Sequence, residues 1–182
     1  MYKNLPEEEL KARIGDAFFA DFDCDTIIGK IDFCAVQKQK ANAKHVLTGR
    51  DTVSLLWAEA KRGTVTDIYK PLVQLILTIG KARTFDTYLP PPFLAAFDAE
   101  KIAFLPYREI LPFLALNDFN WNVTSSDDKT REFGLLYGAV KATLDKTSYL
   151  FRYDAHETEL RAFIKQELKV SSKPLPLIKN HR

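Results

Sequence analysis

The chain has 182 residues, of which 46% are apolar and 27% charged, and its formal net charge is +2. This composition is typical of one globular domain with a sizeable core, and it excludes a chain that is disordered throughout. Two cysteines are too few for a disulfide framework, and no apolar run reaches the roughly 18 residues of a membrane span.

The first half of the chain contains both helical and strand periodicity. Apolar residues at every fourth position over residues 6–20 predict an amphipathic helix. Alternation over residues 27–36 predicts a strand, and a loop is expected over residues 37–50. Residues 53–60 are apolar on both faces, which predicts a covered strand near the centre of a sheet.

The second half is predicted to be mainly helical after one hairpin. The pattern predicts a helix, two hairpin strands and three further helices, in that order, at residues 66–82, 93–98, 101–106, 107–116, 128–146 and 155–169. This order favours an α/β fold, with an α+β mixed sheet flanked by helices and a helical carboxy-terminal part. We expect a core at residues 1–106, a helical extension packed on it at residues 107–170 and a linker at residues 171–182.

The most informative polar residues stand at the end of the second predicted strand. Glu59 and Lys61 are two residues apart, so an extended strand projects both from one face. The carboxyl ends of strands are where α/β folds often place their sites. The alternative interpretation is an ordinary surface pair of opposite charges.

A second carboxylate lies inside the first predicted strand. Asp32 is flanked by apolar residues, and a buried aspartate is costly to ionise unless it is paired or binds a cation. If the two strands are antiparallel neighbours, Asp32 and Glu59 approach each other. Two such carboxylates suit Mg²⁺, and with Lys61 to orient or deprotonate a water molecule, or to stabilise developing charge, they suit phosphodiester hydrolysis.

The motifs GKID over residues 29–32 and WAEAK over residues 57–61 stand in this order, with 26 residues between Asp32 and Glu59. With a helix predicted before the first motif and after the second, the chain resembles the PD-(D/E)XK nuclease superfamily, to which many restriction endonucleases belong. The resemblance covers roughly residues 6–106. It implies a restriction-endonuclease-like core that cleaves DNA with Mg²⁺, or with Mn²⁺ as a substitute.

More narrowly, the chain is similar to the amino-terminal cleavage domain of bacterial restriction enzymes that fuse a nuclease to a DNA methyltransferase. This resemblance implies double-stranded DNA as the substrate and a methyltransferase or specificity domain as a partner in a longer polypeptide. The expected location is the cytoplasm, because the amino-terminal residues contain no apolar signal region.

The family resemblance also implies two accessory positions. Glu7 on the first helix is the candidate to assist the metal site, with Glu8 and Glu9 as alternatives. All three glutamates equally suit the positive end of a helix dipole. Gln74, on the helix after the Glu-x-Lys strand, is the second candidate, and a solvated helix position is its alternative.

The loop over residues 37–50 is basic and contains no acidic residue. If it forms a hairpin tip beside the site, its cations can neutralise DNA phosphates and position the duplex without reading its sequence. Otherwise it is a solvated surface loop. The candidate DNA contacts are Lys38, Lys40, Lys44 and Arg50.

Two further functions stay open on the sequence alone. A repair or recombination nuclease of the same fold would carry the same motifs. A catalytically degenerate nuclease-like module would bind only DNA or a partner domain, and its carboxylates would point apart.

Overall fold

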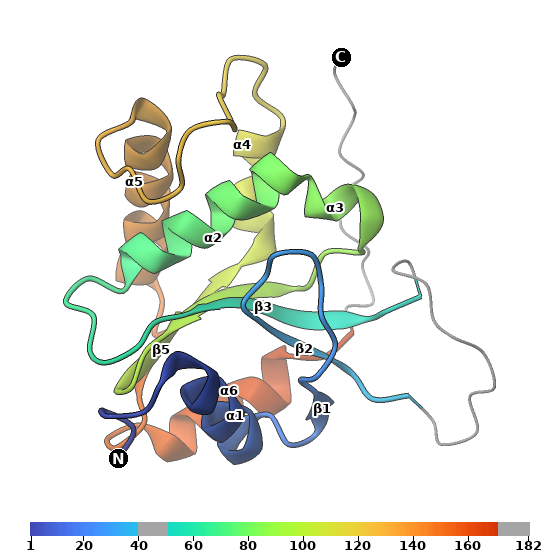
Figure 1. The fold of residues 1–182 in the computed structure, drawn as a ribbon, viewed down its shortest axis with the longest axis vertical. Coiled ribbons are helices and arrows are strands. Elements are labelled where there is room, and N and C mark those ends of the chain that lie inside the picture. Colours follow the sequence, from blue (N-terminus) through green and yellow to red (C-terminus); the bar gives the residue numbers. More distant parts are fainter. Residues whose placement is uncertain (40–50, 171–182) are drawn as a thin grey trace.

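A six-stranded mixed sheet forms the centre of the computed structural model, which describes residues 1–39 and 51–170 (Figure 1). The strands are β1 (Phe22–Asp23), β2 (Phe33–Gln37), β3 (Ser54–Ala60), β4 (Phe93–Phe97), β5 (Lys101–Pro106) and β6 (Leu150–Arg152). They lie side by side in chain order. Neighbouring strands are antiparallel except β3 and β4, which run parallel. The mixed α/β fold class predicted from the sequence is confirmed.

Helices cover both faces of this sheet (Figure 1). They are α1 (Glu7–Phe18), α2 (Tyr69–Ala82), α3 (Thr84–Thr87), the 3₁₀ helix η1 (Tyr107–Ile110), α4 (Leu111–Leu114), α5 (Arg131–Lys146) and α6 (Glu157–Glu167). The apolar faces of α1 and α6 share one buried cluster with Phe33 and Phe104 of the sheet. Those of α2 and α5 share a second cluster with Trp57 and Leu94 on the opposite face. The domain is therefore a sheet between two helical layers.

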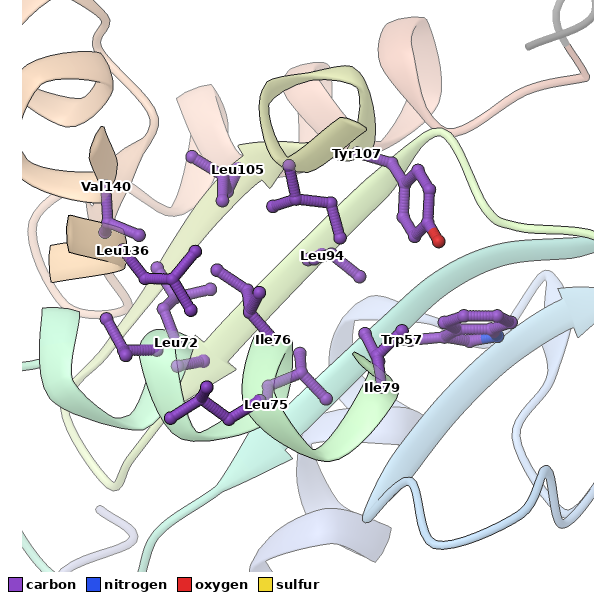
Figure 2. Packing of buried hydrophobic residues seen from close by; sticks show 14 of the residues in the cluster. Trp57, Leu72, Leu75, Ile76, Ile79, Leu94, Leu105, Tyr107, Leu136 and Val140 are labelled. Atoms are coloured by element: carbon purple, nitrogen blue, oxygen red, sulfur yellow. The ribbon is translucent and has the colours of Figure 1, made fainter. Parts of the chain in front are cut away.

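Strand β3 lies inside this sandwich, as its apolar character on both faces predicts. Trp57 is fully buried under α2, where Ile76 and Ile79 approach the sheet (Figure 2). Helix α2 carries the crossover from β3 to the parallel strand β4, which is the connection that parallel neighbours require. The end of β3 is thereby fixed between two strands and beneath a helix.

The strand predicted over residues 27–36 begins later than expected. β2 starts at Phe33, because the preceding residues turn instead of extending. Gly29 has a φ of 50°, a conformation that glycine adopts without a steric penalty. The backbone N–H of Ile31 donates to the carbonyl of Ile28, which closes this turn. Asp32 is consequently the last residue before the strand.

The carboxy-terminal part is more than the expected helical extension. The predicted helices over 107–116, 128–146 and 155–169 are present as η1 with α4, as α5 and as α6. Strand β6, which the sequence analysis missed together with β1 and α3, adds an antiparallel edge to β5. Residues 107–170 thus complete the central sheet and both helical layers.

Among residues 1–39 and 51–170, no helix is long and apolar enough to cross a membrane. The linker predicted at residues 171–182 lies outside the described residues, as do three of the candidate DNA contacts, Lys40, Lys44 and Arg50.

Candidate active site

The Glu-x-Lys motif ends strand β3 as predicted. Glu59 is the penultimate residue of β3 and Lys61 follows the strand directly. The Lys61 Nζ lies 3.4 Å from the Glu59 Oε1, and their side chains are 34% and 17% exposed. A carboxylate and an ammonium therefore stand together in a site that is partly closed to water.

Asp32 lies across from Glu59 on the neighbouring strand. The β2–β3 register pairs Phe33 with Ala58, and one further step places Asp32 opposite Glu59. The Ala60 N–H donates to the Asp32 Oδ2 over 3.3 Å, which holds the carboxylate at the end of β3. The structure thus brings together the two carboxylates that the sequence analysis paired.

The closeness of the two carboxylates changes their electrostatics. Burial, and then the negative charge of Asp32, raise the pKa of Glu59 from 4.5 to about 7, while Lys61 opposes the rise. A buried carboxyl beside a second carboxylate favours its protonated form. A bound divalent cation would reverse this preference, because it neutralises both negative charges at once.

The donor set at this position fits a hard cation such as Mg²⁺. Mg²⁺ is commonly held by one or two protein carboxylates and completes its shell with water and substrate phosphate oxygens. Asp32 and Glu59 are such a pair. In the described part of the chain, no group of three or more His, Cys, Asp or Glu residues is arranged to hold a metal ion.

The helix α1 residue that contacts the site segment is Lys11, which the sequence analysis missed. Its Nζ donates to the backbone carbonyl of Asp32 over 3.2 Å and also forms an ion pair with Glu8. Glu7 is half-buried one turn earlier on the same stripe. Across residues 1–39 and 51–170, no hydrogen bond or ion pair joins Glu7 to Asp32 or Glu59. The i, i+3 spacing from Glu8 predicts the ion pair of Lys11 but not its contact with the Asp32 carbonyl.

Gln74 is half-buried on α2, with the exposed Lys70 and the half-buried Thr78 one turn to either side. Most of the other positions from residue 71 to residue 80 are buried. The Thr78 hydroxyl donates to the backbone carbonyl of Gln74, while Lys70 pairs with Asp128. Within the described residues, no hydrogen bond links the Gln74 amide to the two carboxylates.

Lys38 is exposed directly after the far end of β2. It is six residues from Asp32, which along an extended strand is about 20 Å. The basic segment therefore starts at the opposite end of β2 from the carboxylates.

Comparisons with known proteins identify no family for this chain. No family model matches the chain, and neither a curated protein nor a solved structure is significantly similar to it.

Proposed function

We propose that this chain is a Mg²⁺-dependent DNA endonuclease domain that hydrolyses phosphodiester bonds. One observation supports the proposal above all others: Asp32 lies opposite Glu59 on adjacent strands, and the Lys61 ammonium lies 3.4 Å from the Glu59 carboxylate. The resemblance to PD-(D/E)XK nucleases rests on the same three residues. Their adjacency favours an active site over a degenerate module, in which the carboxylates would point apart.

Each of the three side chains has a chemical role in this proposal. Asp32 and Glu59 hold Mg²⁺, which when bound polarises the phosphate and lowers the pKa of an attacking water. Glu59 must release its proton to serve as a ligand, since its pKa is near 7 without a cation. The Lys61 ammonium can orient the attacking water and stabilise negative charge that develops on the phosphoryl oxygens.

Calorimetric titration with Mn²⁺ tests the metal site directly. The wild-type protein is expected to bind Mn²⁺, and Asp32→Ala and Glu59→Ala are each expected to abolish binding, because each removes half of the protein ligands. The matched control is Asp128→Ala, which removes an exposed carboxylate paired with Lys70. A short DNA duplex is included in a second titration, because phosphate oxygens complete the shell of such a cation.

Cleavage of duplex DNA is measured on the same variants. Loss of cleavage together with loss of Mn²⁺ binding supports the assignment. Mn²⁺ binding that survives in both alanine variants, or cleavage that is unchanged in Glu59→Ala, would overturn it.

We extend the proposal to a restriction–modification enzyme of the cytoplasm that acts beside a DNA methyltransferase domain. This step rests on the family resemblance alone. Cleavage of unmodified DNA that stops when the same DNA is methylated would support it. Cleavage that is indifferent to methylation favours the alternative, a repair or recombination nuclease of the same fold.

A further inference from the structure

The chain that follows Lys61 is held at every second residue by the β4–β5 hairpin. The Lys61 N–H donates to the carbonyl of Phe97, and the carbonyl of Gly63 accepts from the Ala99 N–H, each over 2.9 Å. Two residues later, the Val65 N–H donates to the Asp98 Oδ2 over 2.7 Å. The backbone that carries Lys61 is therefore fixed to the tip of a hairpin more than 30 residues away in sequence.

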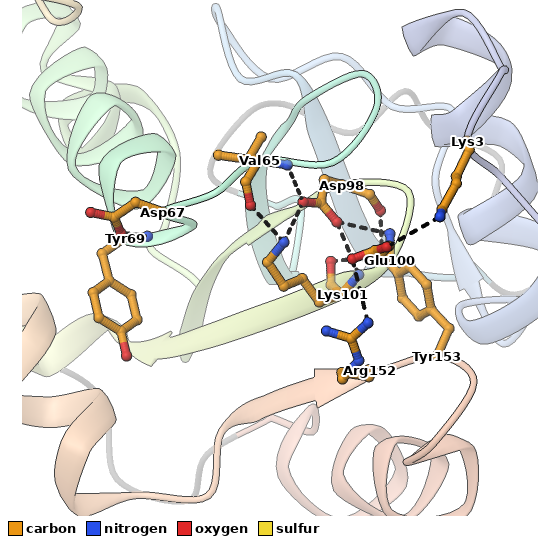
Figure 3. A network of polar contacts seen from close by, with 9 residues as sticks. All are labelled: Lys3, Val65, Asp67, Tyr69, Asp98, Glu100, Lys101, Arg152 and Tyr153. Atoms are coloured by element: carbon orange, nitrogen blue, oxygen red, sulfur yellow. Dashed lines mark hydrogen bonds and ion pairs between the residues drawn. The ribbon is translucent and has the colours of Figure 1, made fainter.

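A buried ion pair forms the last of these links. The Lys101 Nζ lies 2.7 Å from the Asp98 Oδ2 and also donates to the Val65 carbonyl over 2.7 Å (Figure 3). The Asp98 side chain is fully buried and that of Lys101 is 11% exposed. Val65 is thus held by both of its backbone polar groups, one through Asp98 and one through Lys101.

The hairpin tip is itself fixed from the other side. The Tyr153 hydroxyl lies 3.0 Å from the Asp98 carbonyl and 3.1 Å from the Lys101 carbonyl (Figure 3). The backbone N–H of Tyr153 donates to the backbone carbonyl of Glu100. The second Asp98 oxygen, Oδ1, accepts from the backbone N–H groups of Glu100 and Lys101. The pair therefore has little freedom to move relative to β4 and β5.

A buried ion pair is a poor device for stability, because the cost of desolvating both charges offsets their attraction. An apolar pair would avoid that cost, but it would leave the backbone groups that Asp98 and Lys101 bind without partners. What the charged pair provides is a fixed position for the Val65 backbone, since its ammonium donates to the Val65 carbonyl and its carboxylate accepts from the Val65 N–H. That position sets the path of the chain back to Lys61.

We propose that Asp98 and Lys101 are positioning residues for Lys61, acting through the backbone of residues 61–65. This inference rests on the proposed nuclease function. Within residues 1–39 and 51–170, no hydrogen bond or ion pair joins either residue to Asp32 or Glu59, so their effect is expected on the chemical step and not on metal binding.

The test compares Lys101→Met with Lys3→Met. Lys101→Met removes the link to the Val65 carbonyl. Lys3→Met is the matched control, because it breaks a surface ion pair with Glu100 on the same hairpin tip, where Lys3 is 67% exposed. We expect Lys101→Met to lower kcat by about 10- to 100-fold, the size of effect caused by small misplacements of reacting groups, with KM and Mn²⁺ affinity unchanged. Lys3→Met should leave all three quantities unchanged.

Two additional variants keep the test decisive. Asp98→Asn/Lys101→Met removes both charges, so it replaces Lys101→Met if the unpaired Asp98 prevents folding. The double variant Lys61→Ala/Lys101→Met tests whether Lys101 acts only through Lys61. If it does, kcat of the double variant is no lower than that of Lys61→Ala alone. Losses that multiply would instead indicate a general structural role and overturn the proposal.

Amide hydrogen exchange supplies a readout that is independent of cleavage. The Lys61 and Val65 amides should exchange about 10-fold faster in Asp98→Asn/Lys101→Met than in the wild type, while exchange of the Leu56 amide inside β3 is unchanged. Unchanged exchange at both positions would overturn the positioning role. Cleavage and Mn²⁺ binding by the wild-type protein are measured first, because their absence overturns the proposed function itself, whereas unaltered cleavage by the variant overturns only the role of Asp98 and Lys101.

Discussion

Glu59 lies at a position where the fold disfavours the charged form of its side chain. Its carboxyl is buried beside Asp32, and its pKa is raised from 4.5 in the unfolded chain to about 7 in the folded one. The folded protein therefore binds more protons than the unfolded chain between these two values. The free energy of unfolding is expected to fall as the pH rises through this window and to level off above it.

Replacing Glu59 removes this penalty. We expect Glu59→Gln to be more stable than the wild type at pH 8 in the absence of metal, by as much as about 3 kcal/mol, and to show no difference near pH 4. Urea denaturation at both pH values in the presence of EDTA measures the effect. The control is Glu167→Gln, which changes an exposed carboxylate of α6. If Glu59→Gln is less stable than the wild type at pH 8, the ionised Glu59 carboxylate does not destabilise the folded protein and the prediction is wrong.

Strand periodicity predicted that the side chains of Glu59 and Lys61 lie on one face of a strand. The apolar neighbours of Asp32 indicated that its carboxylate needs a partner. Lys11 was missed because its contact is with a backbone carbonyl, which leaves no residue-type signal. The links from Val65 to Asp98 and Lys101 were missed for a related reason. They join segments whose meeting depends on the complete sheet and not on local spacing.

At the scale of elements, helix α5 illustrates how a cap fixes a boundary. The helix was predicted from residue 128 but begins at Arg131, because the Thr130 hydroxyl accepts from the Phe133 N–H over 3.2 Å. α5 in turn contacts the start of α2, where the Tyr137 hydroxyl donates to Asp67. Asp67 also accepts from the Tyr69 N–H at the first turn of α2.

Loss of this cap should weaken the protein measurably. Thr130→Ala is expected to lower the free energy of unfolding by about 1 kcal/mol, whereas Thr130→Ser retains the hydroxyl and most of the stability. Urea denaturation of the two variants separates the hydroxyl from the methyl group. Equal losses in both would assign the effect to packing of the methyl group instead.

The elements that the sequence did not predict are the short ones. β1 has two residues and β6 has three, so neither contains enough alternation to be recognised. Both are strands only because a longer neighbour offers them backbone partners. The long helices and the β4–β5 hairpin carry complete periods and strong turn signals, and they were predicted within a few residues.

On the scale of the whole molecule, two apolar clusters share one sheet. Leu136 of α5 lies in the cluster on one face and Phe163 of α6 in the cluster on the other. Because side chains from the same strands line both clusters, we expect the two helical layers to unfold together.

Truncation of either side chain tests this coupling. Leu136→Ala and Phe163→Ala are each expected to cost about 2–5 kcal/mol and to shift one common transition. Circular dichroism and the fluorescence of the two tryptophans, Trp57 and Trp121, should report the same midpoint in each variant. Separate midpoints would show that the layers unfold independently.

The chain-order arrangement of the strands has a consequence for synthesis. Asp32 and Glu59 stand at β2 and β3, which a ribosome produces early. The segment behind Lys61 gains its support from the β4–β5 hairpin, and that hairpin is fixed by Tyr153, near the end of the described residues. If the proposed nuclease function holds, a nascent chain lacks the support behind Lys61 until Tyr153 has been made, so incompletely translated chains are expected not to cleave the DNA of the cell that makes them.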